Sequence, residues 1–163
     1  MVSFAPTRSN AKNDGKAVEN LIKMANRQYE NLGIASIDKT PNPWQVVRRG
    51  KKIVSAFPVP EEKLVDFEGT LTNGRAVFFE AKSTLIETRF PLNNISEHQY
   101  KFLKNKRRFG AITFVLIEFV KHKEIYFLPF EDLEYWWEKS ERKSIPYSWF
   151  KEQGKEVKPG RRV

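Results

Sequence analysis

The stretch that most constrains the fold is residues 65–82, VDFEGTLTNGRAVFFEAK, which predict a β-hairpin that carries acidic side chains. Its Asn-Gly pair tolerates the positive φ of a tight turn, and the Val, Phe and Thr residues around it favour strands. Pairing of the two strands would bring Asp66 and Glu80 together near one end of a sheet. Glu80 and Lys82 are two residues apart, so their side chains leave the same face of a strand. The hairpin therefore predicts two carboxylates and one ammonium group in one place.

Two carboxylates beside a lysine suit a divalent metal ion with oxygen ligands. Mg²⁺ is usually held by one or two carboxylates together with waters and phosphate oxygens, and a nearby lysine can orient or deprotonate the attacking water. The chemistry implied is phosphodiester hydrolysis. The spacing D-x13-E-x-K has the form of the PD-(D/E)xK nuclease core, with Val65 where that name has proline. Because this spacing also arises by chance in charged proteins, two exposed strand carboxylates and a solvated lysine are the alternative interpretation.

The composition favours a polyanionic partner. The 163 residues include 29 Lys and Arg against 20 Asp and Glu, a formal net charge of +9. Such a charge favours nucleic acid over an acidic small molecule, with solubility alone as the alternative. The lack of cysteine excludes disulfides, thiolate zinc sites and a cysteine nucleophile, and two isolated histidines do not form a His-rich metal site. No apolar run is long enough to cross a bilayer. We expect a cytoplasmic protein with no membrane partner and no small-molecule cofactor.

The length predicts one nuclease domain, residues 14–150, between a flexible basic arm, residues 1–13, and a flexible basic tail, residues 151–163. The first helix of that domain is expected to begin with Asp14 as its N-cap. Glu19 lies beside the apolar stripe of this helix. It either points toward the metal or is an ordinary surface glutamate.

A second, basic hairpin is bracketed by prolines at about residues 43–60. We interpret it as a projecting stalk that contacts nucleic acid; a solvated hairpin that is basic by chance is the alternative. Its candidate DNA-binding residues are Trp44, Arg48, Arg49, Lys51 and Lys52.

A capping-box pattern, Ser96-Glu97-His98-Gln99, predicts a helix that begins near Ser96 and runs to about Arg108. The C-terminal half of this helix is strongly basic and would suit a phosphate backbone, although a charge run also fits a solvated face. The candidate DNA-binding residues here are Lys104, Lys106, Arg107 and Arg108, together with Arg75 beside the turn of the acidic hairpin.

The most hydrophobic run, AITFVLIEF at residues 111–119, predicts a central strand buried on both faces. Residues 124–128 are expected to pair with it in antiparallel fashion, and residues 130–142 to form an amphipathic helix. The succession of a helix, acidic strands, a helix, a buried strand, a further strand and a helix predicts an α/β fold with a mixed central sheet.

Several short stretches occur in an order that identifies a family. They are GKAVE at 15–19, TPNPWQVV at 40–47, DFEG at 66–69, NGR at 73–75, FEAK at 79–82, FPL at 90–92 and HQ at 98–99. On these stretches the chain resembles the RecU family of Holliday-junction resolvases over about residues 13–138. Together they are far more specific than the D…ExK spacing alone.

The resemblance implies a restriction-endonuclease-like fold, a mixed central sheet flanked by helices with a protruding β-hairpin stalk. It also implies a homodimer that uses Mg²⁺ or Mn²⁺ to nick four-way DNA junctions symmetrically during recombination or repair. The metal ligands implied are Asp66, Glu80 and the Ala81 carbonyl, and the catalytic residues further include Lys82, Glu19 and Gln99.

Two alternatives stay open beside a junction resolvase. One is a nuclease of the same core that cuts duplex DNA, and the other is a non-catalytic, junction-binding recombination accessory protein. Val65 before the aspartate, a compact stalk and a short chain depart from the usual form of the family. The shortness is compatible with a phage-encoded member.

Overall fold

The structure is a computed structural model that describes residues 11–59 and 64–158. Its centre is a six-stranded mixed sheet in the order β1-β4-β5-β7-β8-β10. The strands are β1 (Ala35–Lys39), β4 (Phe67–Leu71), β5 (Ala76–Thr84), β7 (Ile112–Phe119), β8 (Glu124–Pro129) and β10 (Lys155–Val157). Within the described residues β5 and β7 are parallel, and every other neighbouring pair in this sheet is antiparallel. Helix α2 (Glu97–Arg108) makes the crossover that a parallel pair requires.

The acidic hairpin of the sequence is β4–β5, and it lies inside the sheet. Gly74 has a φ of 80°, as the tight turn requires, and the Asn73 side chain accepts a hydrogen bond from the Arg75 backbone N–H. Gly69 is opposite Ile37 of β1, where an added Cβ would clash with the β1 backbone. Local turn chemistry and one close backbone approach therefore fix the position of this hairpin.

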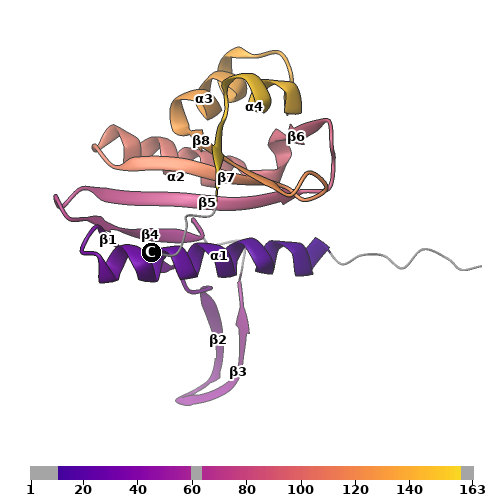
Figure 1. Cartoon of the computed structure of the whole chain (residues 1–163). Coiled ribbons are helices and arrows are strands. Elements are labelled where there is room, and N and C mark those ends of the chain that lie inside the picture. Colours follow the sequence, from indigo (N-terminus) through magenta and orange to yellow (C-terminus); the bar gives the residue numbers. More distant parts are fainter. Residues whose placement is uncertain (1–10, 60–63, 159–163) are drawn as a thin grey trace, which may run out of the picture.

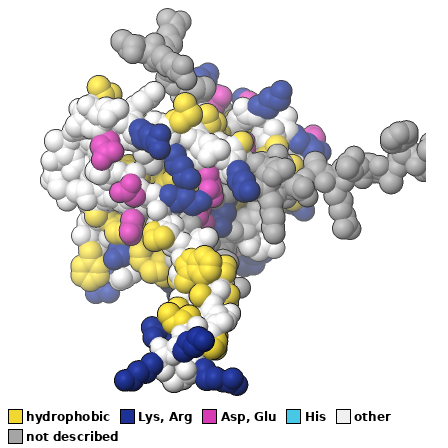
Figure 2. Space-filling view, turned by 90° about the horizontal axis from the view of Figure 1, so that it is seen from below, with side chains coloured by type: hydrophobic (Ala, Val, Ile, Leu, Met, Phe, Trp, Pro, Cys, Tyr) yellow, Lys and Arg dark blue, Asp and Glu magenta, His cyan; other side chains and the backbone are white. Residues whose placement is uncertain are grey.

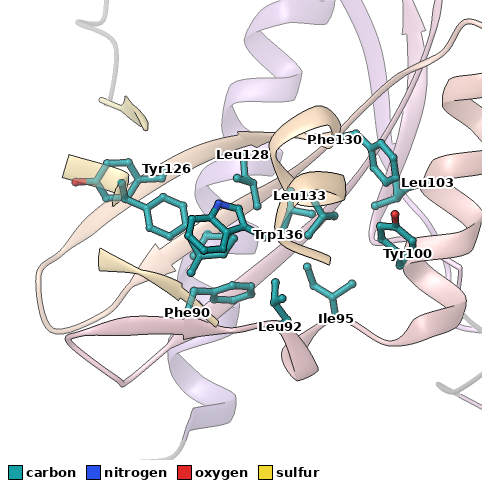
Figure 3. Close-up of a cluster of buried hydrophobic side chains, with 14 of the residues drawn as sticks. Phe90, Leu92, Ile95, Tyr100, Leu103, Tyr126, Leu128, Phe130, Leu133 and Trp136 are labelled. Carbon is teal, nitrogen blue, oxygen red and sulfur yellow. The ribbon is translucent and has the colours of Figure 1, made fainter. Parts of the chain in front are cut away.

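Helices cover both faces of the sheet. On one face, α1 (Ala11–Asn31) buries Val18 and Ile22 against Phe67, Val77 and Phe79. The other face carries α2, α3 (Phe130–Glu134), the π-helical turn η3 (Tyr135–Lys139) and α4 (Tyr147–Gln153). A short sheet of β6 (Arg89–Pro91) and β9 (Ser144–Pro146) and the 3₁₀ turn η2 (Leu92–Asn94) complete that layer. Figure 3 shows the dense aromatic and aliphatic cluster that they enclose.

Strand β7 has the predicted central place but not the predicted burial. Val115, Ile117 and Phe119 are fully buried under α2, α3 and α4. Phe114 and Leu116 point to the α1 face, where they are only partly buried. The helical segment after β8 is also shorter than the predicted residues 130–142, because it ends at Lys139 and its second half is π-helical.

The basic hairpin, β2 (Trp44–Arg49) and β3 (Lys52–Pro58), forms a separate two-stranded sheet. Every residue of both strands is exposed. Figure 1 shows this hairpin projecting away from the central sheet, past α1. The predicted protruding stalk is confirmed, although residue 60 at its expected end lies outside the described residues.

Regular secondary structure extends into both the predicted arm and the predicted tail. Helix α1 begins at Ala11, so residues 11–13 are helical and Asp14 lies inside the helix and is not its N-cap. At the other end, α4 continues to Gln153 and β10 pairs with β8. Strand β10 is only three residues long and has polar neighbours, so the sequence gives no strand signal there. Its backbone hydrogen bonds come from the pairing with β8. Residues 1–10 and 159–163 lie outside the described residues.

The predicted α/β architecture is confirmed: a mixed central sheet flanked by helices, with a projecting hairpin. Within the described residues, the helices are all too short or too polar to cross a membrane.

Candidate active site

The end of the β4–β5 hairpin brings Asp66 and Glu80 into contact. The last residue pair of the ladder is Phe67 with Phe79, so Asp66 lies one residue beyond it, opposite Glu80. The Asp66 backbone N–H donates to Glu80 Oε2 at 3.1 Å, and the Ala81 backbone N–H donates to Asp66 Oδ2 at 3.2 Å. Each strand thus positions the acid of the other. The prediction that these two carboxylates meet is confirmed.

Glu80 is the most enclosed group of the site, with 2% of its surface exposed. Its Oε1 atom accepts a hydrogen bond from Gln99 Nε2 at 2.9 Å and lies 2.8 Å from Lys82 Nζ. The Lys82 side chain is 22% exposed, so it lies between the buried carboxylate and solvent. The shared strand face predicted for Glu80 and Lys82 is confirmed by this ion pair.

Burial is the main influence on the charge of Glu80. The pKa of Glu80 is raised to about 7, because burial raises it most, the nearby Lys82 ammonium lowers it, and the negative charge of Asp66 raises it. A carboxyl held this way ionises more readily when a further positive charge approaches. A strongly raised pKa in a carboxylate pair is typical of functional sites.

The donor set fits a hard divalent cation. Asp66 and Glu80 supply carboxylate oxygens from adjacent strands, and the Ala81 carbonyl follows Glu80 directly. Among the residues that the structure describes, no group of three or more His, Cys, Asp or Glu side chains gathers in a way that could hold a metal ion. A metal here would therefore depend on two carboxylates, a backbone carbonyl and oxygens from water or phosphate, the pattern usual for Mg²⁺.

Glu19 contacts a residue that the sequence analysis missed. Its carboxylate on α1 pairs with the ammonium group of Lys39 at the end of β1. Lys39 is opposite Phe67, and the next residue, Thr40, donates its backbone N–H to the Asp66 carbonyl at 2.8 Å. The pair thus lies beside the Asp66 backbone, and the catalytic role of Glu19 stays a prediction. A lysine directly before the Thr-Pro-Asn-Pro motif was the signal available in sequence.

Gln99 reaches the site because α2 begins beside it. Ser96 caps the helix by accepting from the Gln99 backbone N–H at 3.2 Å, and the Gln99 side chain accepts from the Ser96 N–H at 3.1 Å. The predicted capping box is confirmed. The same Gln99 side chain donates to Glu80, so the start of α2 is tied directly to the acidic hairpin.

The candidate DNA-binding residues of the stalk lie apart from this site. Figure 2 shows Lys and Arg side chains at the tip of the projecting hairpin and apolar side chains nearer its base. The tip residues are Arg48, Arg49, Lys51 and Lys52, and Trp44 is at the base of β2. Arg75 lies at the turn of the acidic hairpin, where its Nε donates to the Gly110 carbonyl at 2.7 Å.

Two of the four candidate cations at the basic end of α2 pair with acids of the following helical layer, and the other two lie against aromatic rings. Lys104 lies 3.2 Å from Glu134 and 2.5 Å from Glu138, and Arg107 lies 2.7 Å from Glu131. Lys106 lies over the rings of Phe78 and Phe102, and Arg108 lies near the ring of Phe109. These cations help to pack α2 against its neighbours.

Comparison with known proteins agrees with this geometry. The model of the family described as RecU, Recombination protein U, matches residues 13–163. The Holliday junction resolvase RecU of Pediococcus pentosaceus is 36% identical over 148 residues, which cover 86% of this chain and 73% of that protein. The protein of the same name from Geobacillus sp. (strain WCH70) is 34% identical over 152 residues, 88% of this chain and 75% of that protein.

A solved structure, that of Archaeoglobus fulgidus Hjc, a Holliday junction resolvase from an archaeal hyperthermophile, is a more distant match. It aligns with a TM-score of 0.49 and 15% identity over 83% of this chain and 93% of that chain, too distant a likeness to carry an argument. The family model, by contrast, spans the acidic hairpin, the stalk and the capping box of α2. The chain therefore belongs to the RecU, or Recombination protein U, family.

Proposed function

We propose that this protein is a structure-selective, metal-dependent DNA endonuclease that resolves four-way junctions by paired, symmetric nicks. The observation that carries the proposal is the reciprocal bonding of Asp66 and Glu80, with Lys82 on the same buried carboxylate. The names of its relatives, Holliday junction resolvase RecU, supply the class of substrate. Recombination and repair are the processes in which such junctions arise.

The resolvase family suggests a divalent metal ion, and we propose Mg²⁺ or Mn²⁺. Asp66, Glu80 and the Ala81 carbonyl would hold it, and when bound it would polarise the scissile phosphate and lower the pKa of a bound water. Lys82 would orient the attacking water or offset charge on the phosphate. Gln99 keeps Glu80 in place through its hydrogen bond, and Glu19 would act beside Asp66 through Lys39.

DNA contacts in this proposal come first from the stalk. Its four tip cations and Trp44 are exposed, which suits a projecting element that enters the open centre of a junction. Arg75, Lys106 and Arg108 are proposed as further contacts. Lys104 and Arg107 have weaker support, because Glu131, Glu134 and Glu138 already partly neutralise them. Phosphate contacts and junction shape, more than base edges, would govern binding.

The proposed active form is a homodimer located in the cytoplasm. The described residues of each chain hold one such pair of carboxylates with its lysine, whereas symmetric resolution requires two cuts in strands of like polarity. A two-fold dimer would supply two equivalent sites at a fixed separation.

The test compares a mobile four-way junction with a matched linear duplex, each with Mg²⁺ or with EDTA. Wild type should nick opposing arms of the junction in pairs only with Mg²⁺ and should spare the duplex. Asp66→Asn should abolish nicking, whereas Glu68→Gln, an exposed acid two residues along β4, should not.

Three results would contradict the proposal. Equal cutting of duplex would indicate a duplex nuclease with the same core. Tight junction binding without metal-dependent nicking would indicate an accessory protein. Nicking by Asp66→Asn at the wild-type rate would remove the site from consideration.

A further inference from the structure

The side chain of Gln99 connects two separate pieces of structure. Its Oε1 atom accepts from the Ser96 backbone N–H at 3.1 Å, which belongs to the cap of α2. Its Nε2 atom donates to Glu80 Oε1 at 2.9 Å, which belongs to the candidate metal site. One amide group therefore transmits the position of a helix start to a buried carboxylate.

These two bonds together select one orientation of the amide. An N–H group donates and a carboxylate oxygen accepts, so a Gln99 amide turned by 180° would face donor to donor at Ser96 and acceptor to acceptor at Glu80. The Ser96 N–H thus holds the amide oxygen on one side, and the amide nitrogen must face Glu80. Without that N–H, the Gln99 side chain would lose one of the two bonds that fix its orientation.

The Ser96 N–H is itself fixed by the core. The preceding residue, Ile95, is 1% exposed and belongs to the cluster of buried residues shown in Figure 3. Ser96 also accepts from the Gln99 backbone N–H through Oγ, which closes the capping box. The donor that orients Gln99 is therefore anchored to the packed layer of the fold.

We propose that Ser96 is a positioning residue of the active site, acting through its backbone N–H on Gln99 and through Gln99 on Glu80. This inference rests on the proposed function of the site. Gln99 and Lys82 both contact Glu80 Oε1. Gln99 is then the donor that keeps this carboxylate in place while Lys82 acts on water or phosphate.

Two substitutions at one position separate the N–H from the hydroxyl. Ser96→Ala removes Oγ and keeps the N–H, whereas Ser96→Pro removes both. Proline suits this place, because Ser96 has φ −73° and ψ 152° and Ile95 has φ −103° and ψ 126°. Replacing the alanine of Ser96→Ala by lactic acid, so that an ester replaces the amide, removes the N–H alone and serves if the proline variant does not fold.

Each variant is measured in two ways: Mn²⁺ binding by calorimetry without DNA, and single-turnover nicking of a junction at saturating protein and metal. We expect the Mn²⁺ affinity and the nicking rate of Ser96→Pro and of the ester to be about tenfold below those of Ser96→Ala. Losses of this size are typical for groups that support metal ligands. In a Gln99→Met background, where no amide remains to orient, this difference should disappear.

Two outcomes would overturn the inference. In the first, Ser96→Pro and the ester have the same Mn²⁺ affinity and the same nicking rate as Ser96→Ala. The other is a difference that persists unchanged in the Gln99→Met background, since that would reflect a general effect on α2. Both differ from failure of the proposed function, in which wild type itself would not nick the junction.

Discussion

The two hairpins of this protein have similar local signals and opposite environments. Both carry a glycine turn between strand-forming residues, with a positive φ at Gly50 and at Gly74. The hairpin β4–β5 lies within the main sheet, and its Glu80 is buried and hydrogen bonded. The hairpin β2–β3 pairs only with itself among the described residues, and all its residues are exposed.

The buried hairpin can hold its side chains in fixed positions, whereas the exposed hairpin can extend to a partner away from the main sheet. The Glu80 carboxylate is buried and held in one position by its hydrogen bonds, as chemistry on a phosphate requires. Exposure leaves the stalk cations hydrated and able to meet phosphates, but their contribution is then screened by salt. The two hairpins should therefore respond differently to the same kind of substitution.

The largest effect is expected for the lysine of the buried hairpin. Lys82→Ala should lower the rate of nicking on bound junction by about 10²–10⁴-fold, the range for loss of a group that assists proton transfer. Junction binding should change little. Lys121→Ala, which removes an exposed lysine in a surface ion pair, is the control. A Lys82→Ala enzyme within a few-fold of wild type would rule out this role.

Two phenylalanines, one in each hairpin, should differ in how much they contribute to the stability of the fold. Phe79 is 3% exposed and stacks on Phe67 and Phe114, so Phe79→Ala should cost about 3–5 kcal/mol of unfolding free energy. Phe57, in β3, is 43% exposed, so Phe57→Ala should change the unfolding free energy by less than about 0.5 kcal/mol. Urea denaturation of both variants measures this, and equal losses would mean that the stalk packs against something.

The pKa of Glu80 predicts a pH effect on the metal-free protein. Because the pKa of Glu80 is raised from 4.5 to about 7, the folded state binds its proton more tightly than the unfolded state. Stability from this group is present below pH 4.5 and is lost as pH rises through about 7. The loss is at most about 3 kcal/mol.

Glu80→Gln should not show that loss. The difference in unfolding free energy between wild type and Glu80→Gln, measured by urea denaturation in EDTA from pH 4.5 to 8, isolates the carboxyl. A difference that stays constant with pH would contradict the raised pKa.

The smallest effect on the nicking step is expected from the stalk tip. Changing its four cations to glutamine should weaken junction binding and make the dependence of log affinity on log salt less steep by up to about 4. The rate on saturated junction should stay near wild type. The variant positions are Arg48, Arg49, Lys51 and Lys52, and the charge-matched control positions are Lys121, Lys123, Lys139 and Lys143. An unchanged salt dependence would mean that the tip does not meet phosphate.

Features that depend on near neighbours were predictable from the sequence. The alternation of β5, the Asn-Gly turn and the spacing of Asp66, Glu80 and Lys82 gave the acidic hairpin and its contacts. The capping box predicted that α2 begins near Ser96, which is its N-cap. Each of these signals spans a few residues or one strand pair, so local conformational preferences are enough to define it.

Features that depend on residues distant in the sequence could not be predicted from it. Lys39 beside Glu19, and the acids that engage Lys104 and Arg107, lie 20 to 34 residues away in the sequence. The start of α1 at Ala11 and the pairing of β10 were likewise missed, because polar termini give no periodic signal.

The sequence by itself determined the two hairpins and where the candidate catalytic and DNA-binding residues lie on them, since turn residues and strand alternation act locally. Only the tertiary structure decided that Glu80 is buried, that Gln99 bonds to it, and that Lys104 and Arg107 of α2 face acids while the cations of the stalk face solvent. Burial and pairing depend on which segments pack together, and that depends on the whole chain at once.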